Sequence, residues 1–332
     1  DGITDVAGPR FPGFENGTGA VFSAGASPDG HYIAYMEGVT LAIYDVRAQT
    51  PPADALHTGT KYLPTVLLWS PDSQYLALGD EGFTANSTHI VSIVPTTIPE
   101  SPPVPGTSAP VTGPYIYPEG WIDNHTLLMY TNIVQSRNPF TTTTLVEALD
   151  ISTGATRTIA TFPHGERSNF VFAVSPDGQE VFLYNFPARD QPFTPVTLII
   201  NTATGSIHPL PSLVGLQIKQ DIIVSAAAWR PGAHTLALTI GAVDPNVPTA
   251  GVFLVDTDTG TYTPIKSMDY VAAWSPNGST LVLSNAANNE NGSGAGPFTL
   301  TAVTFAPSGQ AKVTPLTHDS MFFTFLGFIR SA

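Results

Sequence analysis

Short runs of apolar and β-branched residues alternate with tight polar turns along most of the chain. One stretch shows the layout clearly: the runs 271–274 and 280–284 flank a turn, and the runs 298–305 and 312–316 follow. Runs of this length, bounded by Gly, Pro, Asn and Ser, predict β-strands rather than helices. We therefore expect units of four consecutive strands, called a, b, c and d, with antiparallel pairing.

The turn between strands a and b recurs with the pattern Ser-Pro-Asp/Asn-Gly. Six copies are found, the third and fifth of them degenerate: 27–30, 70–73, 122–125, 175–178, 230–233 and 275–278. The residues immediately before these turns are Ala26, Trp69, Trp121, Val174, Trp229 and Trp274. Their spacings of 43 to 55 residues match β-propeller blades, whereas helical repeats of similar period need long 3.6-residue patterns that are missing here.

A second turn joins strands c and d. Strand c ends in Asp or Asn and a Gly follows four residues later, at 150–154, 201–205 and 256–260. Asp or Asn at the start of a turn accepts a hydrogen bond from the backbone two residues on, and Gly accepts a positive φ. This structural role is sufficient for the turn aspartates, so we expect no catalytic or metal-binding role for Asp29, Asp72, Asp177 and Asp256.

Four-stranded units cannot bury both faces alone, but radial stacking buries a core between neighbours. We therefore expect an all-β chain, a single β-propeller of four-stranded antiparallel blades over residues 1–332. Residues 1–20 form an N-terminal extension, about 21–317 form six units, and 318–332 supply a closing strand. Six blades are favoured. The alternative is seven blades with an incomplete closing blade, because Phe328 repeats the tryptophan position.

The combined pattern resembles the WD-like repeat of the TolB-type propellers. The resemblance rests on Trp/Val-Ser-Pro-Asp/Asn-Gly before an apolar strand, and on a later strand that ends in Leu/Val-x-Asp with a Thr-Gly turn. It covers about residues 21–317. It implies a bacterial propeller, in a family that ranges over periplasmic scaffolds, protein-binding modules, propeller domains of peptidases and sensor ectodomains. It does not select one of these functions.

Composition narrows the setting. Charged residues are only 11% of the 332 residues, the net charge is −14, and there is no cysteine. Twelve Lys and Arg residues cannot readily neutralise a phosphate backbone, which disfavours a nucleic-acid partner. Without cysteine there is no disulfide, thiolate metal site or cysteine nucleophile. No apolar run is long enough for a membrane helix. Few charges and abundant Thr, Ser, Pro and Gly favour an extracytoplasmic location.

Alternation of strands places the a–b and c–d turns on one face of the ring and the b–c and d–a connections on the other. We expect the second face to carry all the long insertions, at 80–88, 99–119, 131–144, 185–195, 241–249 and 284–297. Long loops on a rigid scaffold are where binding usually occurs. The candidate binding residues are Phe83, Arg137, Phe140, Phe186, Arg189, Asp190, Phe193, Asp244 and Glu290. Aromatic and arginine side chains suit contact with a protein or a glycan, and we expect a protein or cell-envelope partner.

Reactive constellations are not evident in the sequence. There is no G-x-S-x-G, H-E-x-x-H or phosphate-binding loop, and the histidines are dispersed. We predict no cofactor, although carboxylates leave room for a structural Ca²⁺ that no loop spacing marks. A non-catalytic binding propeller is therefore the first hypothesis. The alternatives are a glycosidase or lyase that pairs Glu119 with a loop carboxylate, Asp190, Asp244 or Glu290, and the ectodomain of a membrane sensor or kinase.

Overall fold

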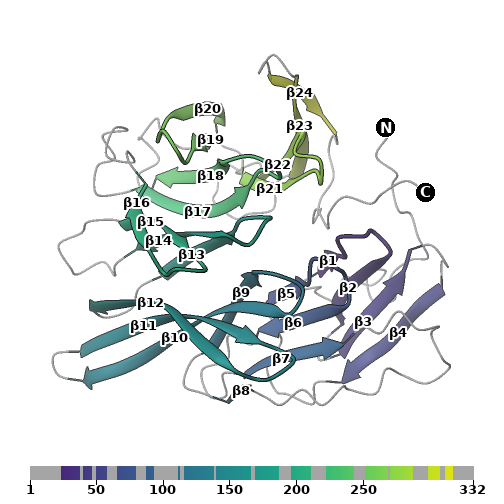
Figure 1. The fold of residues 1–332 in the computed structure, drawn as a ribbon. Helices are drawn as coiled ribbons and strands as arrows, with labels where there is room; N and C mark the ends of the chain where they lie inside the picture. The colour runs from purple at the N-terminus through teal and green to yellow at the C-terminus, as the bar shows by residue number, and fades with distance from the viewer. Residues whose placement is uncertain are drawn as a thin grey trace. The chain divides into compact units, whose positions relative to one another are not determined.

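The regular structure consists of β-strands alone in the part of the chain that the computed structural model describes (Figure 1). The described residues are 24–37, 40–46, 50–57, 66–79, 87–92, 111–112, 116–137, 140–165, 169–186, 196–210, 222–242, 251–267, 270–286, 298–306 and 311–316. They form six four-stranded sheets in which neighbouring strands pair in chain order. None of them forms a helix that could cross a membrane.

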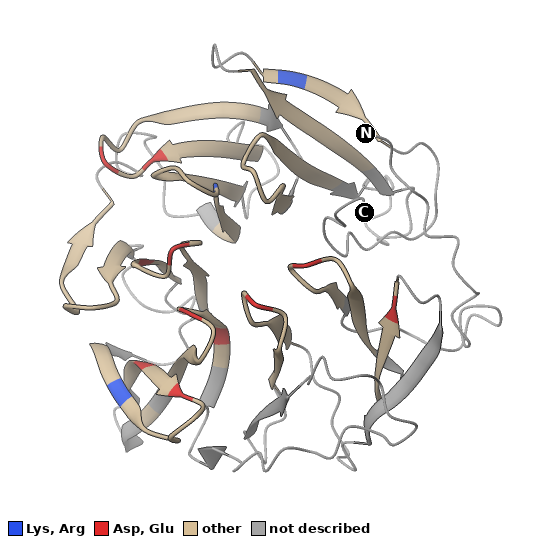
Figure 2. Cartoon of the chain, turned by 45° about the vertical axis from the view of Figure 1, so that its right-hand side comes forward, with Lys and Arg blue, Asp and Glu red and all other residues tan. Residues whose placement is uncertain are grey.

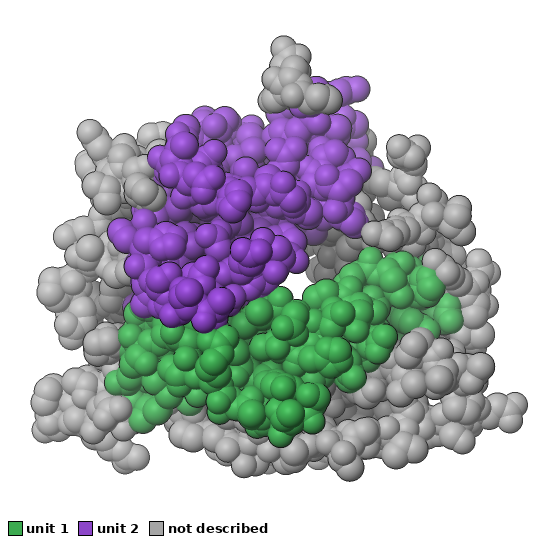
Figure 3. Space-filling view, in the orientation of Figure 1, with its two compact units in different colours: residues 1–135, 143–162, 326–332 green, residues 136–142, 163–325 purple. Residues whose placement is uncertain are grey.

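The chain divides into two compact units (Figure 3). Unit 1 comprises Asp1–Gln135, Thr143–Phe162 and Leu326–Ala332, and unit 2 comprises Ser136–Thr142 and Pro163–Phe325. The prediction of one domain over residues 1–332 stays a prediction, as do the extension at 1–20 and the closing strand at 318–332, which lie outside the described residues.

Unit 1 holds two complete sheets and most of a third. The first sheet is β1 (Ala24–Ala26), β2 (Tyr32–Glu37), β3 (Thr40–Asp45) and β4 (Thr50–His57). The second is β5 (Val66–Trp69), β6 (Tyr75–Gly79), β7 (Ser87–Ser92) and β8 (Val111–Thr112). The third is β9 (Ile116–Trp121), β10 (Thr126–Arg137), β11 (Phe140–Asp150) and β12 (Thr156–Gly165).

Unit 2 holds the other three sheets. The first is β13 (Asn169–Val174), β14 (Glu180–Phe186), β15 (Val196–Asn201) and β16 (Ile207–Pro209). The second is β17 (Ile222–Trp229), β18 (Thr235–Ala242), β19 (Gly251–Asp256) and β20 (Tyr262–Ser267). The third is β21 (Tyr270–Trp274), β22 (Thr280–Ala286), β23 (Phe298–Phe305) and β24 (Ala311–Pro315). Every pair within these sheets is antiparallel. The predicted set of four strands is confirmed in each sheet.

Apolar side chains fill the space between neighbouring sheets of a unit. In unit 2, Phe182 and Ile199 of one sheet pack with Leu236 and Leu238 of the next. In unit 1, Leu41 packs with residues of the second sheet in the same way. These side chains are almost fully buried. Burial between sheets is what the radial-stacking argument predicts for four-stranded units with two apolar faces.

In four of the six described sheets, the tryptophan at the last position of strand a joins the sheet to the one before it. Its indole N–H donates to a strand-a carbonyl of the preceding sheet, one residue before the position that matches the tryptophan. The four bonds run from Trp69 to Gly25 (3.0 Å), from Trp121 to Leu68 (2.9 Å), from Trp229 to Ala173 (2.9 Å) and from Trp274 to Ala228 (3.1 Å). The recurring tryptophans thus pack between neighbouring sheets.

The tryptophan bonds are distributed evenly between the units. In each unit the second and third sheets carry the tryptophan, while the first sheet has a smaller residue there, Ala26 in unit 1 and Val174 in unit 2. Each unit is thus a set of three sheets held by two indole hydrogen bonds. A buried hydrogen bond stabilises by about 1 kcal/mol, and the large ring adds apolar burial.

Two predictions about the insertions are wrong. Residues 131–144 were expected as a loop, but β10 continues to Arg137 and β11 begins at Phe140, because β-branched residues on both sides favour strand. The insertion at 99–119 was expected among the b–c and d–a connections. Strand β8 lies inside it, so residues 93–110 are the c–d connection of the second sheet. This strand has two residues, too few to give a sequence pattern.

Candidate functional site

We name the two ends of a sheet by their connections. The turn end carries the a–b and c–d turns, and the loop end carries the b–c and d–a connections. The side chains of the nine predicted binding residues at the loop end lie outside the described residues: Phe83, Arg137, Phe140, Phe186, Arg189, Asp190, Phe193, Asp244 and Glu290. The backbone is described for three of them. Arg137 ends β10, Phe140 begins β11 and Phe186 ends β14.

The structure describes one of the two carboxylates that a glycosidase site would need. Glu119 lies in β9 and is half-buried. Its three candidate partners, Asp190, Asp244 and Glu290, lie outside the described residues. The pair therefore stays a prediction.

The a–b turns use their serine and acidic side chains to satisfy the backbone. In the turn 175–178, Ser175 Oγ donates to Asp177 Oδ1 (2.6 Å) and accepts from the backbone N–H of Glu180 (2.9 Å). Asp177 Oδ1 also accepts from the N–H of Gln179 (3.1 Å). The hydrogen bond from Ser175 is the largest of the effects that lower the pKa of Asp177. The turns at 27–30, 70–73 and 275–278 repeat this arrangement.

The c–d turns use their acidic residues in the same way. Asp150 Oδ1 accepts from Ser152 Oγ (2.6 Å) and Ser152 N–H (2.8 Å), and these bonds lower the pKa of Asp150 to about 2. Asn201 occupies the same position in another sheet, and Gly154 and Gly205 close the two turns at φ values of 73° and 70°. Figure 2 shows many of the acidic residues at turns of this kind. The predicted structural role of the turn aspartates is confirmed.

Three histidines lie next to a–b turns at the turn end. His31 is 3.5 Å from Asp29, and His234 is 3.8 Å from Asp258 and 3.9 Å from Glu180. His125 meets the ring of Tyr75 edge-on. Among the described residues, no group of three or more His, Asp or Glu side chains could hold a metal ion.

The turn at 230–233 departs from the others. It reads Arg-Pro-Gly-Ala, and its positive φ lies at the third residue, Gly232 (71°), whereas the other a–b turns with a positive φ have it at the fourth. Pro followed by Gly at positive φ is the pattern of a type II turn. The backbone still closes, with Arg230 N–H donating to Thr235 O (2.8 Å). This turn has neither the serine nor the acidic side chain of the consensus.

The Arg230 side chain reaches the next sheet. Its Nε–H donates to the carbonyl of Gly278 at 2.7 Å. Its guanidinium carbon lies 5.3 Å from the centre of the Trp274 ring and 5.2 Å from that of Phe305. Cation–π contacts of this kind stabilise by about 0.5–2 kcal/mol. The guanidinium is therefore held in one orientation by a hydrogen bond and two rings.

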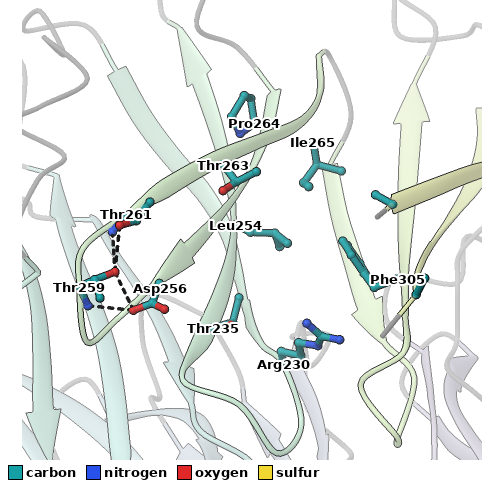
Figure 4. Close-up of a pocket in the computed structure, with 12 residues that line it drawn as sticks. Arg230, Thr235, Leu254, Asp256, Thr259, Thr261, Thr263, Pro264, Ile265 and Phe305 are labelled. Carbon is teal, nitrogen blue, oxygen red and sulfur yellow. Dashed lines mark hydrogen bonds between the residues drawn. The ribbon is translucent and has the colours of Figure 1, made fainter. Parts of the chain in front are cut away.

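A groove of about 650 Å³ opens above this guanidinium, between the sheets β17–β20 and β21–β24 (Figure 4). We call it the Arg230 groove. Its walls are hydroxyl-bearing and apolar side chains, with one carboxylate: Thr235, Leu254, Asp256, Thr259, Thr261, Thr263, Pro264, Ile265, Phe305, Ala306 and Ala311. In Figure 4 the Arg230 guanidinium points toward Phe305, away from the turn that holds Asp256.

Sequence reasoning identified the turn at 230–233 as a degenerate repeat and assigned Arg230 no role. The available signal was that, of the six a–b turns in the sequence, this one lacks both the serine and any Asp or Asn. Phe305 occupies the position that Thr257 takes in the preceding sheet, since its backbone N–H bonds to Ser279 O as Thr257 N–H bonds to His234 O.

No protein-family model matches the sequence, and no curated protein matches it either. Solved structures do resemble it. An oligogalacturonate lyase in complex with manganese superposes with a TM-score of 0.57, over 86% of this chain and 77% of that chain, at 12% sequence identity. The chain has a β-propeller fold. Its four-stranded antiparallel sheets are the blades, and the resemblance to known propellers is confirmed at the level of architecture.

A protein from Agrobacterium tumefaciens provisionally assigned as TolB gives a TM-score of 0.47 at 16% identity, over 74% of this chain and 80% of that chain.

Proposed function

We propose that this chain is a non-catalytic, six-bladed propeller that binds a protein or cell-envelope partner outside the cytoplasm. The six four-stranded sheets of the described residues support the number of blades. The low content of charged residues and the abundance of Thr, Ser, Pro and Gly support the location. The partner-binding surface is the loop end, where the b–c and d–a connections leave the blades.

The alternation of the strands is the observation that carries this proposal. In four blades the b–c connections, at 80–86, 187–195, 243–250 and 287–297, leave from the loop end. The positions of Arg137, Phe140 and Phe186 at strand ends put them at the same end. Connections of this length on a hydrogen-bonded scaffold can vary without disturbing the fold, so they are suited to recognition.

The test begins with capture of a partner from a cell-envelope extract by the immobilised chain, followed by identification of that partner. Its affinity is then measured for the triple variant Phe140→Ala, Phe186→Ala, Phe193→Ala. We expect roughly tenfold to hundredfold weaker binding, since aromatic anchors dominate interfaces. Ile207→Ala is the control, because Ile207 is an exposed apolar residue (42% exposed) near the turn end. Equal affinity of the triple variant and the parent chain would exclude the loop end.

The fold likeness to oligogalacturonate lyase supports a second candidate, a carbohydrate-active enzyme. The half-buried Glu119 on strand a of its blade would be one carboxylate of the site. The parent chain is incubated with oligogalacturonate and a panel of other glycans, and the products are followed by chromatography. Turnover that is lost in Glu119→Gln supports this candidate, and no turnover of any glycan rejects it.

A further inference from the structure

The Arg230 groove lies at the turn end, so it is separate from the loop-end surface and goes beyond the proposed function. We propose that the groove binds the C-terminal carboxylate of a peptide segment whose last residues are uncharged and apolar. The carboxylate contacts the Arg230 guanidinium, and the adjoining side chains contact the apolar part of the groove wall.

The turn does not need arginine in order to form. Its backbone hydrogen bonds are made by Arg230 N–H, to Thr235 O, and by Ala233 N–H, to Arg230 O, and neither uses the side chain. In the consensus turns a serine stands at this position. In the turn 175–178 its hydroxyl donates to the Asp177 carboxylate and accepts from the N–H of Glu180. The Arg230 side chain is therefore not needed to close the turn. Its interactions are the contacts that the guanidinium makes with the next sheet.

The guanidinium keeps a pair of parallel donors. Its Nε–H is taken by the Gly278 carbonyl, and no described residue accepts from its two Nη groups. These groups form the end-on fork that binds a carboxylate through two hydrogen bonds. The bond to Gly278 and the stacking on Trp274 and Phe305 already fix the fork. A ligand therefore loses little affinity to the ordering of this side chain.

The walls of the groove suit a peptide. Leu254, Ile265 and Phe305 give apolar surface on which a C-terminal side chain can pack. Thr235 and Thr263 also line the groove, and their hydroxyls make no hydrogen bond to another described residue, so they are available to peptide N–H and C=O groups.

Asp256 is the acidic residue of the groove, and its own turn engages it. Its Oδ1 accepts from Thr259 N–H (2.8 Å), Thr259 Oγ1 (2.9 Å) and Asp258 N–H (3.1 Å). The first of these bonds is the largest of the effects that hold the pKa of Asp256 below its ordinary value. Asp256 and Arg230 form no ion pair among the described residues, so the fork remains open to a carboxylate from outside.

The charge of the whole chain selects among anionic ligands. At a net charge of −14, a polyanion such as an oligouronate is repelled along its length. A segment with one terminal carboxylate meets the Arg230 guanidinium and gains apolar burial beside it. This difference favours the end of a peptide over an acidic glycan.

The test is a titration of the ¹⁵N-labelled full chain with N-acetyl-alanyl-leucyl-valine and, separately, with its C-terminal amide. The four indole N–H signals are followed by NMR and assigned with Trp→Phe variants. We expect the free acid to shift the Trp274 signal saturably, and the amide to bind at least about tenfold more weakly. The Trp69 signal is the internal control, since Trp69 makes the same indole bond and its ring stacks on Tyr32.

Variants separate charge from geometry. Arg230→Met should weaken binding of the free acid by roughly tenfold to a hundredfold. Arg230→Lys keeps the charge and loses the fork, so it should weaken binding by about tenfold; it also serves if Arg230→Met does not fold. Lys312→Met removes an exposed positive charge from β24 and should leave the affinity unchanged.

Three outcomes would overturn the proposal. They are the absence of a Trp274 shift up to the solubility limit of the peptide, equal affinities for acid and amide, and unchanged affinity in a folded Arg230 variant. Trigalacturonate is titrated in parallel. Tighter binding of this sugar than of the peptide would reassign the groove to acidic glycans and overturn the peptide proposal.

Discussion

Two junctions between neighbouring blades, one in each unit, share the indole hydrogen bond of a tryptophan and differ in the group that lies over its ring. In unit 1, between β1–β4 and β5–β8, Trp69 donates to Gly25 and its ring stacks on Tyr32 with centres 6.2 Å apart and planes at 16°. In unit 2, between β17–β20 and β21–β24, Trp274 donates to Ala228, and Arg230 takes the position over its ring.

The ties between the a–b turns differ in the same way. In unit 1 the N–H of Asp29 donates to Ser73 Oγ at 3.1 Å, so backbone meets a short neutral side chain. In unit 2 Arg230 Nε donates to Gly278 O at 2.7 Å and leaves its fork unused by the described residues. The two junctions thus share the strand arrangement and the indole hydrogen bond, and they differ because Arg230 stands where the consensus turn has a serine.

Replacement of the tryptophan should give the largest effect. Trp274→Ala removes a buried ring (7% exposed), its hydrogen bond and the support of Arg230, and it should lower the free energy of unfolding by about 3–5 kcal/mol. Trp69 is half-buried, so Trp69→Ala should lower it by less, roughly 2–3 kcal/mol. Urea unfolding measures both values.

Hydrogen exchange shows where each loss acts. Trp274→Ala should speed exchange in β17–β24 and leave β1–β8 unchanged, and Trp69→Ala should do the reverse, because each indole bond lies within one unit. Equal acceleration in both regions for either variant would contradict the division into two sets of three sheets.

The glycine at the contact between the turns should give the next largest effect. A Cβ on Gly278 would lie 2.6 Å from the carbonyl oxygen of Pro231, and Gly278 has a φ of 66°. Gly278→Ala should therefore combine backbone strain with a clash against the Pro231 carbonyl, and it should lower the free energy of unfolding by about 3 kcal/mol.

Gly232→Ala is the matched control at the same junction. Gly232 has a φ of 71°, but a Cβ there would meet nothing within 4 Å. Gly232→Ala should therefore lower the free energy of unfolding by about 1–2 kcal/mol, through backbone strain alone. Thermal or urea unfolding of both variants measures the difference. Equal losses would show that the two turns can move apart at little cost, and the Arg230 groove would then lack a fixed floor.

The sequence predicts most of the fold, because the fold depends on features that repeat. Strand a of the last blade was expected at 271–274 and is found at Tyr270–Trp274, and the matching tryptophans all end a strand a. The turn chemistry of Asp150 and Asn201 was also predicted, since an Asx residue and a glycine four residues apart determine it locally.

The Arg230 groove could not be predicted in the same way. It depends on Arg230, Trp274 and Phe305, which lie far apart in the chain and meet only across a junction. Departures from a repeat indicate where to look, but they do not show which ring or carbonyl a long side chain will reach. The loop end, with Phe186 and Phe193, stays a prediction because its connections follow no repeat.

The serines of the consensus turns test whether turn strength differs between the units. Ser70→Ala leaves the N–H of Tyr75 without its side-chain acceptor, and Ser175→Ala does the same to Glu180. Each should lower the free energy of unfolding by about 1–2 kcal/mol, by similar amounts because the bond lengths agree at 2.9 Å. A loss in one unit only, measured by urea unfolding, would mean that the turns and not the junctions distinguish the units.

The smallest expected effect concerns the two aspartates that begin c–d turns, Asp150 in unit 1 and Asp256 beside the groove. Hydrogen bonds lower the pKa of both, to about 2 for Asp150, so the ionised form stabilises the native state. This contribution is complete above the unfolded pKa, about 4, and is lost as the pH falls through the folded pKa. Asp150→Asn and Asp256→Asn should keep the turns, as Asn201 does, and reduce the loss of stability between about pH 4 and pH 2. Acid titrations of stability measure this.

Peptide affinity should be unchanged in Asp150→Asn and equal or slightly higher in Asp256→Asn, and a lower affinity in Asp256→Asn would make Asp256 a ligand-binding residue.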